Sequence, residues 1–518
     1  MTLISLYAFL IFLSLFTPIL SLCLSTVRPR WKIANAFMLT GFSANFIIWL
    51  MTVLKVDVAS PIAMLHFTPV TSTVLLLVQF IGYVVFKYAM QNFELDQDNK
   101  RFLQWFLITI FAVMLTVSSN HLLLLWLGWV SVSISLHQLL MFYPQRYRAA
   151  LAAHKKFIFA RVAEIFLAAA FLLIYFAHGT GFIDDILTQY PVASLSLNLH
   201  IAAILIALVV LIKCAQLPLH GWLVQVVESP TPVSAFLHAG IINMGGMLLL
   251  VFAPIFSQSL PAQLLVLVFA TSSAVLASLV MMSITSIKVK LAWSTIAQMG
   301  LMLIECALGL YTLALLHLLA HSVYKAHAFL SAGEAVNQHV MQNNLQTLNR
   351  TSDWQLATII SAIGLIAAIY FNLITAPFSP WVIMTGTTIV LMANRNPVKN
   401  PLNAIMPTLG LIVAYLILKT TIGNMLITPQ HHYVWQFDLI VSLLFVMLLI
   451  SYYYLFVFKQ QKLPGVAMRL LNAGFYLDEW STRITLSIWP IHLPKKQPKH
   501  QLHKVYKHDI SKQTQSVS

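Results

Sequence analysis

The sequence predicts an all-α, polytopic membrane protein with about fifteen transmembrane helices, some of them broken. Of its 518 residues, 59% are hydrophobic and only 9% are charged, whereas soluble globular proteins carry roughly a quarter charged residues. Apolar runs of bilayer-crossing length, about 20 residues, recur along the chain. Lipid offers the backbone no hydrogen-bond partners, so these runs must form helices. The alternating segments of about ten residues that mark a transmembrane β-barrel do not occur in the sequence.

The spans follow from the apolar runs in order. The first run is long for a signal-peptide core and lacks a basic start, so we expect it to be the first span. The expected spans are residues 3–24, 33–54, 70–90, 102–119, 121–142, 156–177, 199–216, 232–256, 262–283, 289–309, 311–331, 355–376, 379–394, 403–422 and 435–458. They divide the chain into N-terminal transmembrane helices (1–100), a central core (101–335), additional transmembrane helices (336–459) and a basic cytoplasmic tail (460–518).

The charge pattern orients these helices. The formal net charge is +15, from 30 Lys and Arg against 15 Asp and Glu. Basic residues follow the odd-numbered spans, as Arg28 follows the first and Lys288 the ninth, whereas the even-numbered ends are nearly bare. Basic loops stay in the cytoplasm, so we expect the N-terminus outside and the C-terminus in the cytoplasm. No basic and aromatic groove or zinc knuckle is present, so nucleic acid is not an expected partner.

The end of the chain turns polar and basic from Lys462 onward. One interpretation is a solvated tail close to anionic membrane lipid, and the other is a docking arm for a partner. The segment 474–480 is too apolar and aromatic for a spacer. We therefore expect this segment to lie on the membrane or on a partner surface.

A lysine at the end of the seventh expected span is the first candidate for ion chemistry. Lys213 lies in the apolar run 207–218, where an ammonium group is costly. Burial favours the neutral amine, so nearby charge tunes its proton affinity. The alternative is that Lys213 extends to the membrane interface, since Pro218 follows closely.

Prolines break the helical pattern immediately after this lysine. Pro218, Pro230 and Pro232 remove backbone donors, and a broken helix at membrane depth forms the polar pocket typical of ion sites in transporters. Histidine titrates near neutral pH and passes protons in both directions, although a single buried histidine is also a common structural residue. The candidates in and after the break are His220, Glu228 and His238.

The eleventh expected span holds the densest cluster of titratable residues. His317, His321 and Lys325 are each four residues apart and therefore share one helix face, along which protons can pass through water. The alternative is a zinc site on the two histidines, which needs a third ligand and lacks an HExxH motif. Accessory candidates are Glu305 in the tenth span, His137 in the fifth, and the pair Arg161 and Glu164 in the sixth, which is also interpretable as a structural ion pair.

The sequence contains no signature of a bound cofactor. A glycine-rich phosphate loop and haem or flavin signatures are missing, so ATP drive and redox chemistry are not expected. The three cysteines stand singly, which predicts neither a disulfide framework nor an iron–sulfur site. We therefore expect a transport or energy-coupling subunit without metal, and not an enzyme.

Four stretches resemble the antiporter-type subunits of respiratory complex I, such as subunit L, and of Mrp sodium/proton antiporters. They are residues 213–220 (KCAQLPLH), 228–238 (ESPTPVSAFLH), 291–300 (LAWSTIAQMG) and 317–325 (HLLAHSVYK). The resemblance covers roughly residues 100–335. It implies an antiporter-like proton-translocation core with inverted repeats. The residues it assigns to the proton path are Lys213, His238, His317, His321 and Lys325.

Departures from this pattern indicate one branch of the family. The fifth helix of the family carries Gly-Trp-Glu, whose glutamate pairs with the lysine of the seventh, whereas residues 128–130 are Gly-Trp-Val. His137 is a candidate substitute. A later turn ending in Ser-Lys and the long lateral C-terminal helix of the complex I subunit are also not found in the sequence. The run 129–138 and the segment 475–480 instead resemble DabB, the branch of membrane subunits of bacterial inorganic-carbon pumps.

This resemblance implies a multi-pass protein of the bacterial cytoplasmic (inner) membrane. It also implies a heterocomplex with DabA, a soluble zinc-containing protein similar to β-type carbonic anhydrases. The pair would use a proton or sodium gradient to convert carbon dioxide to bicarbonate, with zinc and catalysis in the partner and no cofactor in this chain. The alternatives are a proton-pumping subunit of a complex I-like NADH-quinone oxidoreductase or hydrogenase, and a Mrp-type cation/proton antiporter. The sequence leaves open the coupling ion, the stoichiometry, and whether carbon dioxide or bicarbonate contacts this subunit.

Overall fold

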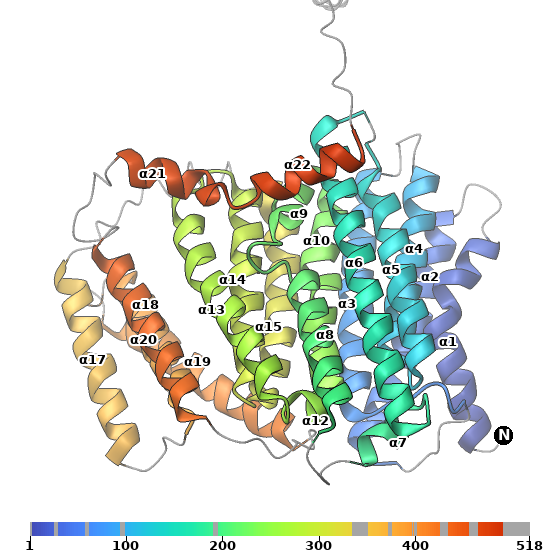
Figure 1. Cartoon of the computed structure of the whole chain (residues 1–518), viewed down its shortest axis with the longest axis horizontal. Helices are drawn as coiled ribbons and strands as arrows, with labels where there is room; N and C mark the ends of the chain where they lie inside the picture. The colour runs from blue at the N-terminus through green and yellow to red at the C-terminus, as the bar shows by residue number, and fades with distance from the viewer. Residues whose placement is uncertain are drawn as a thin grey trace, which may run out of the picture.

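The protein is a bundle of helices, most of them aligned along a common direction (Figure 1). The computed structural model describes residues 3–24, 30–56, 62–93, 99–143, 145–189, 195–333, 351–370, 376–395, 397, 401–424, 434–454 and 465–490. Within these residues, β-type pairing is limited to isolated bridges, which confirms the predicted all-α class.

The helices before the break and through the core have the following bounds: α1 Leu3–Leu24, α2 Arg30–Val53, α3 Pro69–Phe93, α4 Asn99–Ser118, α5 Leu122–Leu140, α6 Tyr147–His178, α7 Ile183–Thr188, α8 Leu197–Lys213, α9 Gly221–Gln225, η1 Val226–Glu228, α10 Thr231–Ala239, η2 Ile241–Asn243, α11 Met244–Val251, α12 Ala253–Phe256, α13 Leu260–Ser283, α14 Ile287–Ala307, α15 Tyr311–Leu330 and η3 Ser331–Gly333. The remaining helices are α17 Thr351–Tyr370, α18 Ser379–Ala393, α19 Pro401–Gly423, α20 Trp435–Tyr452, α21 Gly465–Asn472, η5 Gly474–Tyr476 and α22 Glu479–Ile488.

Each of the expected spans coincides with a helix or a broken helix. Among the described residues, 12 helical segments are long and apolar enough to cross a membrane. α8 and α18 are apolar but shorter, at 17 and 15 residues. α15 has 20 residues but is not among the 12, because its histidines and lysine lower its mean hydropathy. The polar side chains of α15 thus make it the least membrane-like of the core helices.

The predicted start of the sixth span is wrong. α6 begins at Tyr147 and not near residue 156, because the alanine-rich run 149–153 favours a helix. Lys155, which lies just before the expected sixth span, and Lys156 are therefore inside the helix, and both are buried. This places two further lysines in the interior of the bundle.

The break after α8 lies where the sequence predicts it. α9 is only 5 residues long. Pro232 then lies in the first turn of α10, where its missing N–H costs no helical hydrogen bond. η2 separates α10 from α11, so this path through the bundle is interrupted twice. The interruptions bring irregular backbone and His238 into the interior.

Buried side chains form two clusters. The larger runs through α1 to α15 and includes Ile422, Val441 and Leu471 from later helices, and the smaller joins α17 to α18 around Trp354 and Met392. In Figure 1, α17, α18 and α20 stand to one side of the larger group, and α19 reaches towards α15. The candidate site therefore lies in the larger cluster, and α18 and α19 form a wall beside it.

The C-terminal part of the described chain crosses one end of the bundle. We call residues 465–490 the transverse segment; it contains α21 and α22 (Figure 1). The end that it covers is the α22 face, and the opposite end, where α7 and α12 lie, is the α7 face. The rest of the predicted basic tail lies outside the described residues.

The transverse segment packs on the chain's own helices. The Asp478 carboxylate accepts hydrogen bonds from Lys155 Nζ at 2.8 Å and Gln225 Nε2 at 2.9 Å. The Trp489 ring stacks on His154 with centroids 3.8 Å apart and planes at 7°. The stretch 474–480, which the sequence placed on lipid or on a partner, thus has part of its surface committed to α6 and α9.

Gly221 makes the Asp478 contact possible, since a Cβ at this position would overlap the carboxylate. We expect Gly221→Ala to displace the transverse segment and to cost about 1–3 kcal/mol of stability through overpacking. Gly410→Ala is the matched control, because nothing lies within 4 Å of the added Cβ. A thermal-shift measurement on the detergent-solubilised proteins checks this. Equal melting temperatures for the two variants would contradict the contact.

Candidate ion-translocation site

The first candidate cluster surrounds a small internal cavity between α5, α6, α8 and α10. The cavity has a volume of about 20 Å³ and is lined by Trp129, Lys156, Glu164 and Lys213, among others. This is room for about one water molecule. The Lys213 ammonium lies 4.8 Å from the centre of the Trp129 ring, a cation–π distance. Lys213 thus faces the interior of the bundle, which does not favour the alternative that it extends to the interface.

Glu164 supplies an acid to this cluster. Its carboxylate accepts a hydrogen bond from Arg161 at 2.7 Å, so the expected ion pair exists. The Glu164 side chain is only 5% exposed, lines the same cavity as Lys213 and is its electrostatic partner. Trp126 Nε1 donates to the backbone carbonyl of Glu164 at 2.9 Å, which joins α5 to α6 here. Position 130 on α5 carries valine instead of the glutamate expected from the resemblance, and Glu164 on the neighbouring helix α6 places a carboxylate at the Lys213 cavity instead.

Two lysines of this cluster were missed in the sequence. Lys156 Nζ donates to the Ser133 backbone oxygen at 2.7 Å and contacts its hydroxyl at 3.2 Å. Lys155 points to the other side of α6, where it bonds Asp478 and, at 2.7 Å, the Thr482 hydroxyl. The alanine run before them was the available signal, since it extends α6 past both lysines. The two adjacent lysines connect the internal cavity to the transverse segment.

The second cluster begins at His238, which is fully buried. Its Nδ1 lies 3.1 Å from Thr295 Oγ1, whose own proton is donated to the Leu291 carbonyl at 2.9 Å. His238 Nδ1 is therefore the donor in this contact. Lys325, also fully buried, donates to the same Leu291 carbonyl at 3.1 Å. The Leu291 backbone oxygen of α14 thus connects Lys325 to Thr295 and, through Thr295, to His238.

The expected stripe on α15 continues from Lys325. His321 is 5% exposed, and among the described residues neither of its ring nitrogens has a hydrogen-bond partner. The His317 ring centre is 6.3 Å from that of His321, a separation that one water can bridge. His317 Nδ1 lies 3.1 and 3.2 Å from the Glu305 carboxylate oxygens. The spacing of four residues has placed Lys325, His321 and His317 in a file along α15, and His317 at its end contacts the Glu305 carboxylate.

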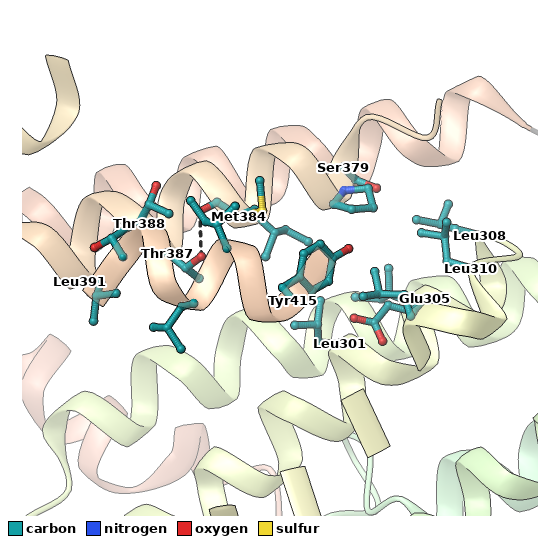
Figure 2. Close-up of a pocket in the computed structure, with 17 residues that line it drawn as sticks. Leu301, Glu305, Leu308, Leu310, Ser379, Met384, Thr387, Thr388, Leu391 and Tyr415 are labelled. Atoms are coloured by element: carbon teal, nitrogen blue, oxygen red, sulfur yellow. Dashed lines mark hydrogen bonds between the residues drawn. The ribbon is translucent and has the colours of Figure 1, made fainter. Parts of the chain in front are cut away.

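Glu305 faces a crevice of about 410 Å³ between α14, α18 and α19. Figure 2 shows its carboxylate on the α14 side, with Ser379, Thr387 and Thr388 on the α18 side and Tyr415 from α19. Most of the lining is apolar, and Glu305 is the only acidic or basic residue among the described residues that line the crevice. The helices α18 and α19 therefore enclose the acid end of the file.

The other accessory candidates lie towards the α22 face. His137 Nδ1 lies 3.2 Å from the Ala153 carbonyl, and its ring is 6.1 Å from His154, next to Trp489. His137 does not line the Lys213 cavity, which leaves Glu164 as the acid there.

His220 and Glu228 flank the broken helix. His220 is 1% exposed and packs on Trp293 with ring centres 4.9 Å apart. Glu228 pairs loosely with Arg148 at 3.6 Å and lines an open cavity of about 380 Å³ together with Arg146 and Lys288. This cavity is strongly polar and lies at the end of the bundle. The break thus presents one buried imidazole and one exposed acid.

No group of three or more His, Cys, Asp or Glu side chains within the described residues is arranged to hold a metal ion. The zinc alternative for His317 and His321 therefore finds no set of three ligands in this part of the chain. The side chains gathered here are amines, imidazoles and carboxylates, which are groups that can donate and accept protons. The arrangement can pass protons in steps and, with two lysines at its centres, can hold a charge within an apolar bundle.

The chain is similar to respiratory and antiporter membrane subunits. Residues 119–386 match the family described as "NADH:quinone oxidoreductase/Mrp antiporter, TM". A probable inorganic carbon transporter subunit DabB of Hydrogenovibrio crunogenus is 43% identical over 90% of this chain and 92% of its own length. A probable subunit DabB2 of Halothiobacillus neapolitanus is 35% identical over 80% of this chain and 78% of its own.

More distant similarity extends to other complexes. NADH-quinone oxidoreductase subunit L of Mycobacterium tuberculosis is 31% identical over 51% of this chain and 42% of its own length. The solved Mrp complex from Dietzia sp. DQ12-45-1b matches with a TM-score of 0.53 at 18% identity, over 99% of this chain and 59% of that chain. At this identity the structural match shows the fold alone.

Proposed function

Since the chain belongs to the transmembrane family of NADH:quinone oxidoreductase and Mrp antiporter subunits, we propose that it is the membrane subunit of an energy-coupled inorganic carbon uptake system. The extent of similarity supports this choice within the family. The DabB relative is matched over 92% of its length, whereas subunit L is matched over only 42%. The function is transport and energy coupling, with the chemistry of carbon dioxide hydration on a zinc-containing, DabA-type partner.

The observation that carries the proposal is a pair of lysines, each inside an apolar bundle and each next to histidine or carboxylate groups. The first is Lys213 with Glu164 and Lys156. The second is Lys325 with His238, and with His321 one turn away. Charged groups at such depth are costly and are characteristic of ion pathways. The proposed coupling ion is the proton, since imidazole and amine groups exchange protons and do not coordinate sodium.

The proposed orientation puts the α22 face in the cytoplasm, as the loop charges indicate. The Lys155–Asp478 contact then links the ion clusters to the cytoplasmic surface where a partner would bind. A transmembrane potential supplies about 2.3 kcal/mol per charge per 100 mV, so one or two protons can bias a hydration equilibrium. Proton movement past Lys156 would therefore change the electrostatic environment of the neighbouring Lys155 and of Asp478 in the transverse segment.

We expect Asp478→Asn to lower carbon uptake about tenfold, which corresponds to ~1.4 kcal/mol of lost coupling. The substitution leaves the fully buried Lys155 ammonium without its carboxylate partner. Glu479→Gln is the control, because Glu479 is 53% exposed and pairs with the exposed Arg483. Uptake of labelled bicarbonate by cells expressing each variant is the measurement. Equal uptake by both variants would mean that the transverse segment is not part of the coupling route.

The test of the function itself is co-purification together with a growth phenotype. A tagged chain extracted from its host membrane in mild detergent should bring down a zinc-containing protein. Deletion of its gene should prevent growth in air but not at elevated carbon dioxide. Co-purification of redox subunits with quinone-linked activity would favour the complex I alternative, and cation exchange by the chain without a large partner would favour an antiporter. Either result would overturn the proposal.

A further inference from the structure

A large cavity opens into the bundle at the α7 face. It has a volume of about 740 Å³ and lies between α3, α4, α5, α7 and α11. Its mouth carries His66, Asn120 and Asp184, and its lining reaches Trp129 in α5. Trp129 is seven residues beyond the start of α5, so the cavity penetrates roughly 10 Å along that helix. This cavity is separate from the crevice of Figure 2.

The mouth of the cavity is held by hydrogen bonds between separate segments. His66 Nδ1 lies 2.6 Å from Asp184 Oδ1, and the two side chains are 40% and 41% exposed, respectively. The Asp184 backbone N–H donates to Asn120 Oδ1 at 3.1 Å, and Asn120 Nδ2 donates to the Ala63 carbonyl at 3.1 Å. Three loops are thus joined around an opening that presents an acid and an imidazole to solvent. Such groups collect and release protons at a surface.

One side chain adjoins both cavities. Trp129 is 3% exposed and lines both this cavity and the Lys213 cavity. Gly128 lets α5 approach α4 closely at this level, because a Cβ there would lie 2.5 Å from Thr116 Oγ1. The Lys213 ammonium lies over the indole, 4.8 Å from its centre, and Lys213 lines the second of these cavities but not the first.

We propose that protons enter from the α7 face through this cavity, and that the Trp129 indole is the gate between the cavity and Lys213. The inference rests on the proposed function, in which the α7 face is outside. The inner walls of the cavity are mostly apolar, so water reaches the lysine only when the indole moves aside. The gate is therefore a hydrophobic one with a titratable lysine immediately behind it.

The charge of Lys213 controls this gate. A cationic lysine attracts the indole face and holds the gate shut, whereas a neutral amine does not. When the gate opens, a hydronium ion gives one proton to the neutral amine and leaves as water. The resulting ammonium draws the indole back and then passes its proton to the Glu164 carboxylate, which restores the neutral amine. The route is thus closed to the outside while the proton moves inward.

Chemical modification inside the cavity tests the route. Val251→Cys and Met247→Cys place thiols on its wall, and Leu123→Cys is the control, since Leu123 is 57% exposed on α5 and does not line the cavity. The probe is a charged methanethiosulfonate that does not cross membranes, added to intact cells. We expect it to reduce carbon uptake about tenfold in both cavity variants and to leave the control unchanged. Treated wild type controls for Cys214 and Cys306, which are buried.

A leak measurement tests the gate independently. In right-side-out vesicles without inorganic carbon, we expect Trp129→Ala to speed inward proton leak about tenfold, as expected for loss of one cation–π contact. Trp129→Phe, which keeps an aromatic face, should leak at close to the wild-type rate. Trp129→Ala combined with Lys213→Ala should return to background, because the lysine is the proton acceptor.

Two outcomes would overturn the inference. One is full uptake after modification of both cavity thiols, and the other is a Trp129→Ala leak no faster than wild type. If either occurs while Lys213→Ala still abolishes uptake, the ion site holds and only this entry route is wrong. If Lys213→Ala retains uptake, the proposed function itself fails.

Discussion

We expect Lys325→Ala to abolish carbon-dependent growth while the complex remains assembled. Lys325 is fully buried and is the only charged side chain on the stripe that joins His238 to His321 and His317. On the proposed path, alanine removes the amine that would hold a proton between His238 and the histidines of α15. Removal of a positioned proton-transfer group typically slows a reaction by about 100-fold or more. Uptake should therefore fall to the level of a strain without the chain.

The control for Lys325 is Lys419→Ala. Lys419 is exposed on α19, and its removal changes the net charge equally without touching the file. Labelled bicarbonate uptake, growth in air and co-purification of the partner are measured for both variants. Normal growth of Lys325→Ala would contradict the path, whereas loss of assembly in Lys325→Ala alone would indicate a structural role.

The sequence was sufficient for the elements whose signal is local. Prolines after Lys213 predicted the break, and the spacing of His317, His321 and Lys325 predicted their shared face. Both follow from helix geometry within a few residues of each other. The spans were also predictable, because bilayer thickness fixes their length. The start of α6 was missed, because His154, Lys155 and Lys156 interrupt the apolar pattern after the alanine-rich run that begins the helix.

Contacts between distant segments were not predictable from one sequence. Lys155 meets Asp478 across 323 residues, and nothing near either residue indicates the other. The Trp129 gate likewise depends on two cavities that meet only after α3, α4, α5 and α8 have packed. In both cases the residue types were visible, but their partners were set by tertiary packing.

The second large effect is expected for Glu164→Gln. Glutamine keeps the size of the side chain and the Trp126 bond to the Glu164 backbone carbonyl, so the fold should be retained. The charge that Lys213 faces across the cavity is lost, together with a proton acceptor. We expect uptake to fall by about 100-fold, as for other proton-transfer groups, and Glu164→Asp to restore part of it.

Arg161→Gln separates this role from that of a structural ion pair. Arg161 is 32% exposed and also bonds Ser133 at 2.9 Å, so its loss removes the ion pair but not the acid. If the pair is structural, both variants should lose thermal stability and uptake together. If Glu164 serves Lys213, Glu164→Gln should be inactive at near-normal stability, and Arg161→Gln should retain most of its uptake.

Moving the carboxylate from α6 to α5 tests whether its position on a particular helix matters. Introducing Val130→Glu into the Glu164→Gln variant returns a carboxylate to α5, one residue from Trp129, and should recover a measurable part of uptake. The Glu164→Gln variant carrying Ile134→Glu is the control, because Ile134 is 42% exposed on α5, whereas Val130 is half-buried. Recovery with Val130→Glu alone means that Lys213 requires a nearby negative charge but does not require it on a particular helix. Equal recovery, or none, from both positions would mean that Glu164 acts through its own geometry on α6.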